Sequence, residues 1–300
     1  MNRVVSALVP ALPRERVAAL RWLVYLFIPV DVLLLHTWGD PHGSASPDLY
    51  TPLVVGDLLH LPTPSVALVD VCKYGSAVAA LLALTGRAPR LLGWTVFALW
   101  GEYQVIAFSY GKVDHDRFDL LIALAVLPTV GRLRVGRTTG LPHPSEAAGW
   151  ALRCIQLAVV ATYFLAGVTK VRFGGWGWVD SATLARAVVR RGTFLSNWML
   201  DVPWTLHVGQ YVILAFELLS PVALFLPLRW QVRVVAFWLS FHLATYAGIT
   251  IMFWPHIICL AAFLPLERWW TRLSPPTPPP AGREYQRAAA GAPASAPPPA

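Results

Sequence analysis

Charged residues are scarce in this chain, and their scarcity excludes an ordinary soluble protein. Only 13% of its residues are Asp, Glu, Lys or Arg, whereas soluble domains carry about 25%. Hydrophobic residues make up 56% of the chain, and the mean hydropathy is +0.54. Most of the sequence therefore needs a surrounding medium that does not tolerate charge, and that medium is a lipid bilayer.

Cysteine is also rare. Cys72, Cys154 and Cys259 each lie in an apolar segment, and they form no CxxC pair. A disulfide framework and a zinc site are thus excluded by pattern, and we expect no bound metal. We interpret the three thiols as small buried hydrophobic groups.

A basic stripe of the kind that binds nucleic acid is missing as well. The net charge is +8, but the basic residues stand singly between apolar runs, so we expect no nucleic-acid partner. Fourteen tryptophans are present, and Trp is enriched at membrane–water interfaces. We therefore interpret the positive charge as a topology signal.

Eight apolar runs approach the roughly 20 residues that a membrane-spanning helix needs. They predict an all-α, polytopic transmembrane helical bundle over residues 20–270. The segment 1–19 precedes it, an amphipathic interfacial helix is expected at about 179–191, and the Pro- and Ala-rich tail 271–300 is expected to be disordered. The predicted spans are Leu20–Trp38, Pro64–Leu84, Leu91–Phe108, Phe118–Val130, Ala148–Lys170, Leu206–Leu228, Trp230–Phe253 and Pro255–Trp269.

The distribution of basic residues fixes the expected orientation. With both termini on the cytoplasmic side, 15 of the 24 Lys and Arg residues lie inside, six outside and three within spans. This bias agrees with the positive-inside rule. We therefore expect an integral protein of the cytoplasmic (plasma) membrane with cytoplasmic N- and C-termini.

Lys170 is the first candidate site residue, because ionisable groups inside spans are costly and usually functional. Tyr163, Gly167 and Lys170 follow one face of the predicted fifth span. A lysine desolvated there would lose its proton more easily and could act as a base. The alternative is a lysine that extends to the interface and anchors the helix end.

Other polar residues lie within the predicted spans or at their ends. His115 and Asp119 are i,i+4 neighbours that could share a hydrogen bond, in a helix end that is either a site or a solvated rim. Asp70 and Lys73 are spaced for an ion pair in the second span. The remaining candidates are His242 and Tyr246 on one face of the seventh span, Glu217 in the sixth and Glu102 in the third. Four of these polar groups, from Lys170, His115, Glu102 and His242, map to the outer half or the outer edge of the bilayer, and they predict a shared cavity that opens outward.

Three segments resemble a known family. They are the run Tyr163-Phe-Leu-Ala-Gly-Val-Thr-Lys170, the run Phe216-Glu-Leu-Leu-Ser-Pro221, and Ser240-Phe-His242 with the following Ile251-Met-Phe253. Their order and spacing are similar to those of the horizontally transferred transmembrane (HTTM) domain. This is the membrane domain of vitamin K-dependent gamma-carboxylase and its bacterial relatives, and the resemblance extends over about residues 14–270.

The resemblance implies an activity as well as a fold. In the carboxylase the lysine that Lys170 matches deprotonates vitamin K hydroquinone, and the histidine that His115 matches in spacing is functionally important. His242 matches the family's histidine in the later span. It thus implies a carboxylase-like lyase or quinol-dependent enzyme, with Lys170 and His115 catalytic. The ligand-binding residues would be Tyr163, Gly167, His242, Tyr246, Glu217 and Glu102.

One departure limits what is carried over. The carboxylase has two adjacent lysines at this point, and here the first position is Thr169. The implied cofactor is vitamin K hydroquinone or another quinol, and the expected partners are the bilayer and a lipid-soluble small molecule. A non-catalytic membrane protein, either a small-solute transporter or an accessory subunit, is the open alternative.

Overall fold

A computed structural model of the chain describes residues 9–131 and 144–268. This part is almost entirely helical, as predicted, because a helix satisfies its own backbone hydrogen bonds in lipid. The strands present in the described part are two short ones, β1 (Leu12–Pro13) and β2 (Pro144–Ser145), which pair antiparallel. The predicted disordered tail 271–300 and the first eight residues lie outside the described part.

Within the described residues, six helices are long and apolar enough to cross a membrane. When the π turn after α2 and the 3₁₀ turn after α9 are included, the ends of these helices fall within a few residues of the predicted spans. They are α2 (Arg14–Val30) with the π-helix η1 (Asp31–Leu35), α4 (Val66–Ala83), α5 (Pro89–Phe108), α7 (Glu146–Gly174), α9 (Trp204–Leu219) with the 3₁₀ helix η8 (Ser220–Phe225), and α10 (Leu228–Ile249). The chain is therefore a helical membrane protein.

The predicted count of eight spans is not confirmed. The fourth and eighth runs form the short helices α6 (Phe118–Val126) and α11 (Trp254–Leu260), which end in the 3₁₀ turns η5 (Leu127–Val130) and η9 (Ala261–Phe263). Their α-helical parts have only 9 and 7 residues, well below the length that spans a bilayer. The remaining elements are α3 (Val54–Leu58), α8 (Thr183–Arg191), η2 (Thr37–Gly43), η3 (Pro47–Leu49), η4 (His115–Arg117), η6 (Trp176–Asp180) and η7 (Asn197–Leu200).

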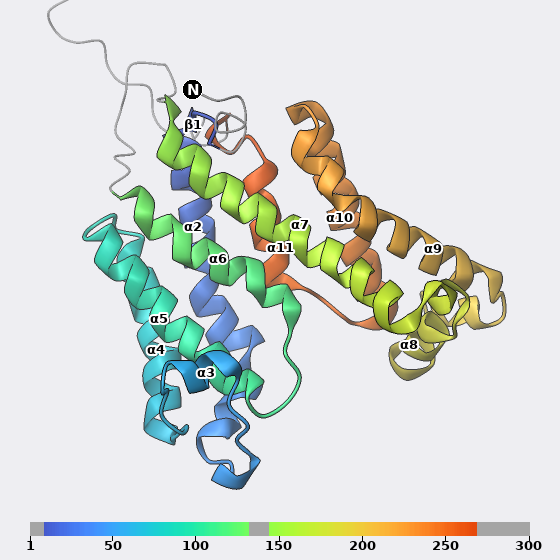
Figure 1. The fold of residues 1–300 in the computed structure, drawn as a ribbon, viewed down its shortest axis with the longest axis horizontal. Helices are drawn as coiled ribbons and strands as arrows, with labels where there is room; N and C mark the ends of the chain where they lie inside the picture. The colour runs from blue at the N-terminus through green and yellow to red at the C-terminus, as the bar shows by residue number, and fades with distance from the viewer. Residues whose placement is uncertain (1–8, 132–143, 269–300) are drawn as a thin grey trace, which may run out of the picture.

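The helices pack around α2, α7 and the short α6 and α11 (Figure 1). The pair α4 and α5 lies against one side of this group, and α9 and α10 extend from the other. The segments predicted to be external, including α3, α8 and the α10–α11 connection, gather at one end of the molecule. The β1–β2 pair lies at the opposite end, where Arg16 and Glu267 form an ion pair of 2.7 Å.

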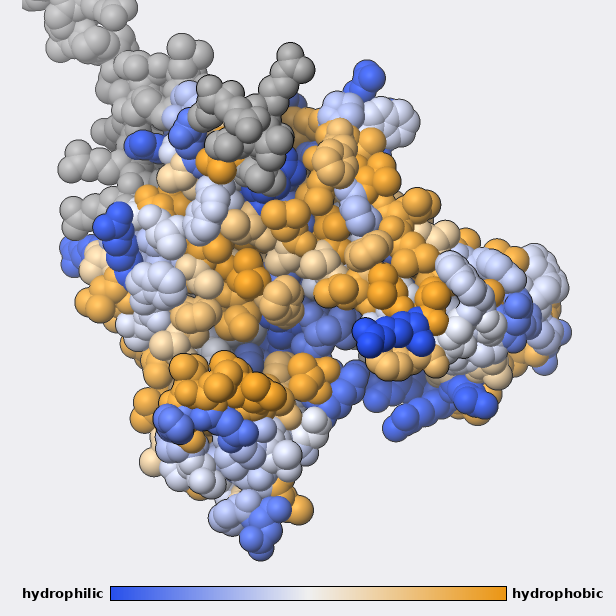
Figure 2. Space-filling model, viewed as in Figure 1, coloured by the Kyte–Doolittle hydropathy of each residue, from blue (hydrophilic) through white to orange (hydrophobic). Residues whose placement is uncertain are grey.

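Apolar side chains both fill the interior and cover the outside. Trp100, Tyr25 and Leu20 are among the fully buried side chains. In contrast, only 28% of the most apolar stretch of α9 and η8, and 17% of that of α10, is buried inside the molecule. Figure 2 shows orange, hydrophobic atoms over much of the flank, which is the surface that lipid would contact.

Two irregular segments shape the end that carries α8. Pro29 removes a backbone donor from α2, and the next turn, Asp31–Leu35, has π geometry. Thr250 has φ +56° and ends α10, so the chain turns sharply before α11 begins at Trp254. Both breaks place polar residues beside the cavities described below.

Candidate functional site

Lys170 is paired with a carboxylate from a neighbouring helix. Its ammonium group on α7 donates to both carboxylate oxygens of Glu217 on α9, at 2.6 and 2.7 Å. The Lys170 side chain is 24% exposed and that of Glu217 is 8% exposed. The isolated desolvated lysine that we considered from the sequence is therefore an ion pair, and Glu217 has a defined partner.

Gly167 allows this contact by keeping α7 and α9 close together. A Cβ atom added at Gly167 would lie 3.1 Å from the Glu217 Cβ and 3.0 Å from the Leu218 Cδ2. These distances are tighter than ordinary van der Waals contact, so a side chain here would force the helices apart. The structure thus gives Gly167 a packing role beside the pair.

The ring of Trp178 lies beside the Lys170–Glu217 pair. The Lys170 ammonium is 5.4 Å from the centroid of this ring, a distance suited to a cation–π contact. The pair carries no net charge when Lys170 is protonated and Glu217 is ionised.

Lys170 also lines a cavity of about 490 Å³, and His115 lines the same cavity. The structure thus brings the two predicted catalytic residues together. Phe118 and Leu165 border the cavity and are 48% and 57% exposed on the flank of the molecule. The other lining residues are Thr162, Ala166 and Thr169. The cavity therefore opens at the surface beside exposed apolar side chains.

Behind this wall lies a buried cluster of rings. The Tyr163 hydroxyl and the His242 Nε2 are 2.7 Å apart, and His256 packs edge-on against Tyr163 with ring centroids 4.6 Å apart. His242 Nδ1 and His256 Nε2 are buried and have no hydrogen-bond partner within the described part of the chain. These ring nitrogens are therefore free to form a further hydrogen bond.

Asp119 is part of this buried cluster and is not the partner of His115. Its Oδ2 lies 2.7 Å from the His256 Nδ1, with both side chains almost completely buried. The predicted His115–Asp119 hydrogen bond is therefore wrong, because Asp119 faces α11 while His115 borders the cavity. His256 was missed, although an ionisable residue in an apolar run already signals a partner elsewhere in the fold.

Two of the predicted ligand-binding residues lie apart from Lys170. Tyr246 is 49% exposed on α10, and Glu102 is only partly buried on α5. Neither residue lines the cavity that contains Lys170 and His115. The shared depth that we inferred from the sequence therefore brings together only some of the polar groups.

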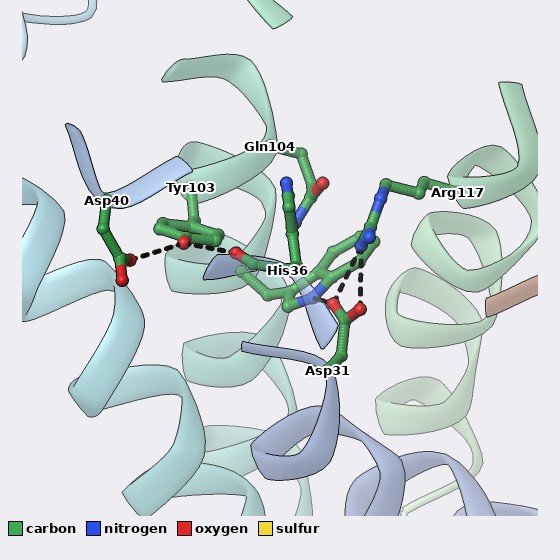
Figure 3. Close-up of polar contacts among 7 residues, drawn as sticks. Asp31, His36, Asp40, Tyr103, Gln104 and Arg117 are labelled. Carbon is green, nitrogen blue, oxygen red and sulfur yellow. Dashed lines mark hydrogen bonds and ion pairs between the residues drawn. The ribbon is translucent and has the colours of Figure 1, made fainter. Parts of the chain in front are cut away.

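A second polar cluster was not predicted from the sequence (Figure 3). Asp31, in the π-helix η1, is fully buried and accepts from the Arg117 Nη1 at 2.9 and 3.0 Å and from the Trp100 Nε1 at 2.9 Å. Two donors thus make three contacts with this carboxylate, and the charge of Arg117 balances its negative charge. π-Helical turns are frequent at functional sites. The π turn would have indicated this cluster, but it cannot be recognised in the sequence.

The cluster extends from Asp31 toward Asp40 and Lys73. The Tyr103 hydroxyl is 2.8 Å from the His36 carbonyl oxygen and 2.9 Å from the Asp40 Oδ1 (Figure 3). Lys73 forms its ion pair with Asp40, whereas Asp70 is exposed. The predicted Asp70–Lys73 pair is therefore wrong, because Lys73 turns toward the η2 segment.

Two titratable groups in the segment before α6 have shifted pKa values. Burial raises the pKa of Asp116 from 3.8 to about 6, although Arg117 opposes the shift. Partial desolvation lowers the pKa of His115, with added effects of Lys112, His256 and Lys170. His115 is therefore neutral at pH 7 and can accept a proton or a hydrogen bond.

No group of three or more His, Cys, Asp or Glu residues within residues 9–131 and 144–268 has a geometry that could hold a metal ion.

The chain matches no protein-family model, and it is not similar to any curated protein or solved structure. The family resemblance of the three sequence segments therefore enters only the proposal that follows.

Proposed function

We propose that the chain is a membrane-embedded enzyme of the carboxylase-like, quinol-dependent kind, in which the Lys170–Glu217 pair takes a proton from a lipid-soluble quinol. The observation that carries the proposal is the position of Lys170. It is held by Glu217 and at the same time lines a cavity on the lipid-facing flank. Vitamin K hydroquinone is the ligand that the family resemblance implies.

The cavity suits a flat ligand that arrives through the bilayer. Its volume of about 490 Å³ lies within the range of small-molecule sites. Phe118, Leu165 and Ala166 provide apolar contacts, while His115 and Thr162 provide polar ones. A quinol would pack its ring and tail against the first group and direct a hydroxyl toward Lys170.

The proposed step moves one proton from the quinol to the pair. The Lys170 ammonium first passes a proton to the Glu217 carboxylate, and the quinol O–H bond then breaks as its proton bonds to the freed Lys170 amine, so the quinol oxygen becomes an anion. The pair changes from a net charge of zero to +1, so it balances the charge of the quinolate in a medium of low dielectric constant. Neutral His115 on the opposite wall would accept a hydrogen bond and orient the ligand.

The distribution of basic residues suggests an orientation for this site. We place both termini in the cytoplasm and the end with α8 outside the plasma membrane, in accordance with the positive-inside rule. Lys170 lies near the C-terminal end of α7, just before η6. In this orientation it is in the outer half of the bilayer. Proton abstraction is the part of the carboxylase reaction that this site supports.

The test uses the purified full chain in nanodiscs with a reduced short-chain naphthoquinone. Lys170→Ala and Lys170→Arg should both abolish quinolate formation, because arginine stays protonated and cannot accept a proton. Lys112→Ala, which alters a lysine whose side chain is 81% exposed, is the matched control and should retain activity. Full activity in Lys170→Arg would show that the lysine only anchors the helix.

The same experiment separates the enzyme from the non-catalytic alternative. Binding of the naphthoquinone is measured by quenching of tryptophan fluorescence, independently of turnover. Binding without quinolate formation in the unmodified protein would favour an accessory subunit that carries the ligand. Absence of binding would remove the quinol proposal and leave a small-solute transporter as the better reading.

A further inference from the structure

A larger cavity lies at the end of the molecule that carries α8. Its volume is about 950 Å³, and its walls come from η1 and η2, the α5–α6 connection, α8 and the α10–α11 connection. Figure 2 shows hydrophilic, blue side chains around a recess at this end, between the α3 region and α8. This cavity is separate from the one that Lys170 and His115 share.

Three arginines from α8 line this cavity without a carboxylate partner. Arg186, Arg190 and Arg191 all contribute to its wall. None of them forms a salt bridge or a side-chain hydrogen bond with the part of the chain that the structure describes. Cationic groups gathered in one concave surface raise the local concentration of anions.

The carboxylates that line the same cavity do not cancel this charge. Asp31 is paired with Arg117, and Asp114 lies 3.2 Å from the Lys112 ammonium. Asp116 is the remaining one, and burial raises its pKa to about 6. Three unpaired guanidinium groups therefore face a single unpaired carboxylate, so the cavity has an excess of positive charge at neutral pH.

The floor of the cavity adds a buried donor. The Arg117 side chain is only 9% exposed, and its hydrogen bonds to the described residues, both to Asp31, use Nη1 alone. Arg117 lines the cavity, and a guanidinium has five N–H donors. Its other donors thus remain available to a group that enters from the open side.

Aromatic rings form the wall that faces these arginines. His42 and Tyr110 both line the cavity and are stacked, with ring centroids 4.6 Å apart and an angle of 2° between their planes. Trp38 lies edge-on to His42 at 6.0 Å. This arrangement offers a flat surface to an organic group that accompanies an anion.

We propose that this cavity binds an organic phosphate, with the phosphate held by Arg186, Arg190 and Arg117 and the organic part packed on the Tyr110–His42 stack. A phosphate monoester carries about −1.5 to −2 charges at pH 7 and three acceptor oxygens, which matches several unpaired guanidinium groups better than one carboxylate does. Guanidinium and phosphate also form paired, parallel hydrogen bonds. The proposal is independent of the quinol site.

The phosphate could belong to a soluble compound or to a lipid headgroup. Exposed Phe194 and Trp198 lie shortly after α8, with 84% and 53% of their surfaces accessible, and such side chains favour the membrane interface. The recess would then receive a headgroup from the outer surface of the bilayer. The two sources share the same recognition chemistry, so the experiment needs an arm for each.

The first arm titrates the full chain, in phosphatidylcholine nanodiscs, with phenyl phosphate and follows binding by calorimetry. The double variant Arg186→Gln/Arg190→Gln should weaken binding about tenfold or more, because each charge-assisted hydrogen bond is strong. Arg87→Gln/Arg229→Gln, which removes the same charge from exposed positions outside the cavity, should leave the affinity unchanged. Lys170→Ala should also leave it unchanged.

The second arm adds phosphatidic acid to the nanodiscs and measures the melting temperature. Stabilisation that depends on Arg186 and Arg190, without binding of phenyl phosphate, would assign the site to a lipid headgroup. Equal effects in the two double variants would overturn the proposal, because the response would then report overall charge. A lack of response to both phosphate compounds would overturn it as well.

Discussion

Both carboxylate oxygens of Glu217 accept from one donor, the ammonium of Lys170, although the two residues are 47 positions apart in the chain. This contact connects the C-terminal part of α7 with the middle of the α9 segment. It also converts a lysine that looked isolated in the sequence into half of an ion pair. The predictions below begin with its contribution to stability.

Breaking the pair from either side should destabilise the protein. Glu217→Ala leaves the ammonium of Lys170 without a partner, and removal of one member of a buried ion pair costs about 3–5 kcal/mol. Because Lys170 is 24% exposed, we expect a value near the lower end. The free energy of unfolding is measured in mixed micelles of increasing denaturing detergent.

The double variant Lys170→Met/Glu217→Leu provides the control for this prediction. Apolar residues of similar volume can replace a buried pair with little loss, so the double variant should be more stable than Glu217→Ala. A double variant that is as unstable as the sum of the two single ones would show that the groups do not interact in the folded protein.

Gly167 should tolerate no larger side chain. Gly167→Leu places atoms where Glu217 and Leu218 already lie, and such overpacking typically costs about 1–3 kcal/mol. It should also lengthen the Lys170–Glu217 contact and reduce the proposed quinol chemistry. Gly177→Leu is a matched control, because an added Cβ there meets no atom within 4 Å. Equal losses of thermal stability in the two variants would contradict the packing role.

Asp116 should make stability decrease as the pH rises. Its pKa is raised from 3.8 to about 6 by burial, so the folded protein holds this proton more tightly than the unfolded chain does. The stabilising contribution is complete below pH 3.8 and is lost as the pH increases through about 6. Arg117 opposes the shift, whereas Asp114 and Asp119 favour it and His256 opposes it.

Asp116→Asn should therefore raise the melting temperature at pH 8 but have little effect near pH 4. The gain is at most about 3 kcal/mol if the whole shift acts on stability. Melting curves of the protein in detergent, recorded between pH 4 and pH 8, give the measurement. Asp57→Asn, at an exposed position, should show no such pH dependence, and a pH-independent gain in Asp116→Asn would refute the assignment.

The predicted orientation can be tested with reporters. A reporter inserted at Ser46 should be external, and one fused after Trp270 should be cytoplasmic, because basic residues concentrate on the latter side. Of the described helices, α4, α5, α7, α9 and α10 lie between the two positions, so five crossings, or seven if α6 and α11 both cross, place the reporters on opposite sides. Both reporters on the same side of the membrane would mean that only one of α6 and α11 crosses the bilayer.

The sequence alone determined the class of protein and the positions of its long helices. Helix α4, for example, occupies Val66–Ala83 where Pro64–Leu84 was predicted, and α5 ends at Phe108 as predicted. This was possible because the free energy of moving a segment into lipid depends on its own composition and length. The short α6 and α11 show the limit of this prediction, because the apolar character of a run does not determine how many of its residues are helical.

Only the tertiary structure decided which polar groups meet. Lys73 forms its ion pair with Asp40 instead of Asp70, and Asp119 lies beside His256 instead of His115. The spacing rules that suggested the local partners describe one isolated helix. In the folded chain, the π-helix at Asp31, the turn at Thr250 and the close packing at Gly167 set the distances between helices, and a buried charge pairs with whichever group that packing brings within reach.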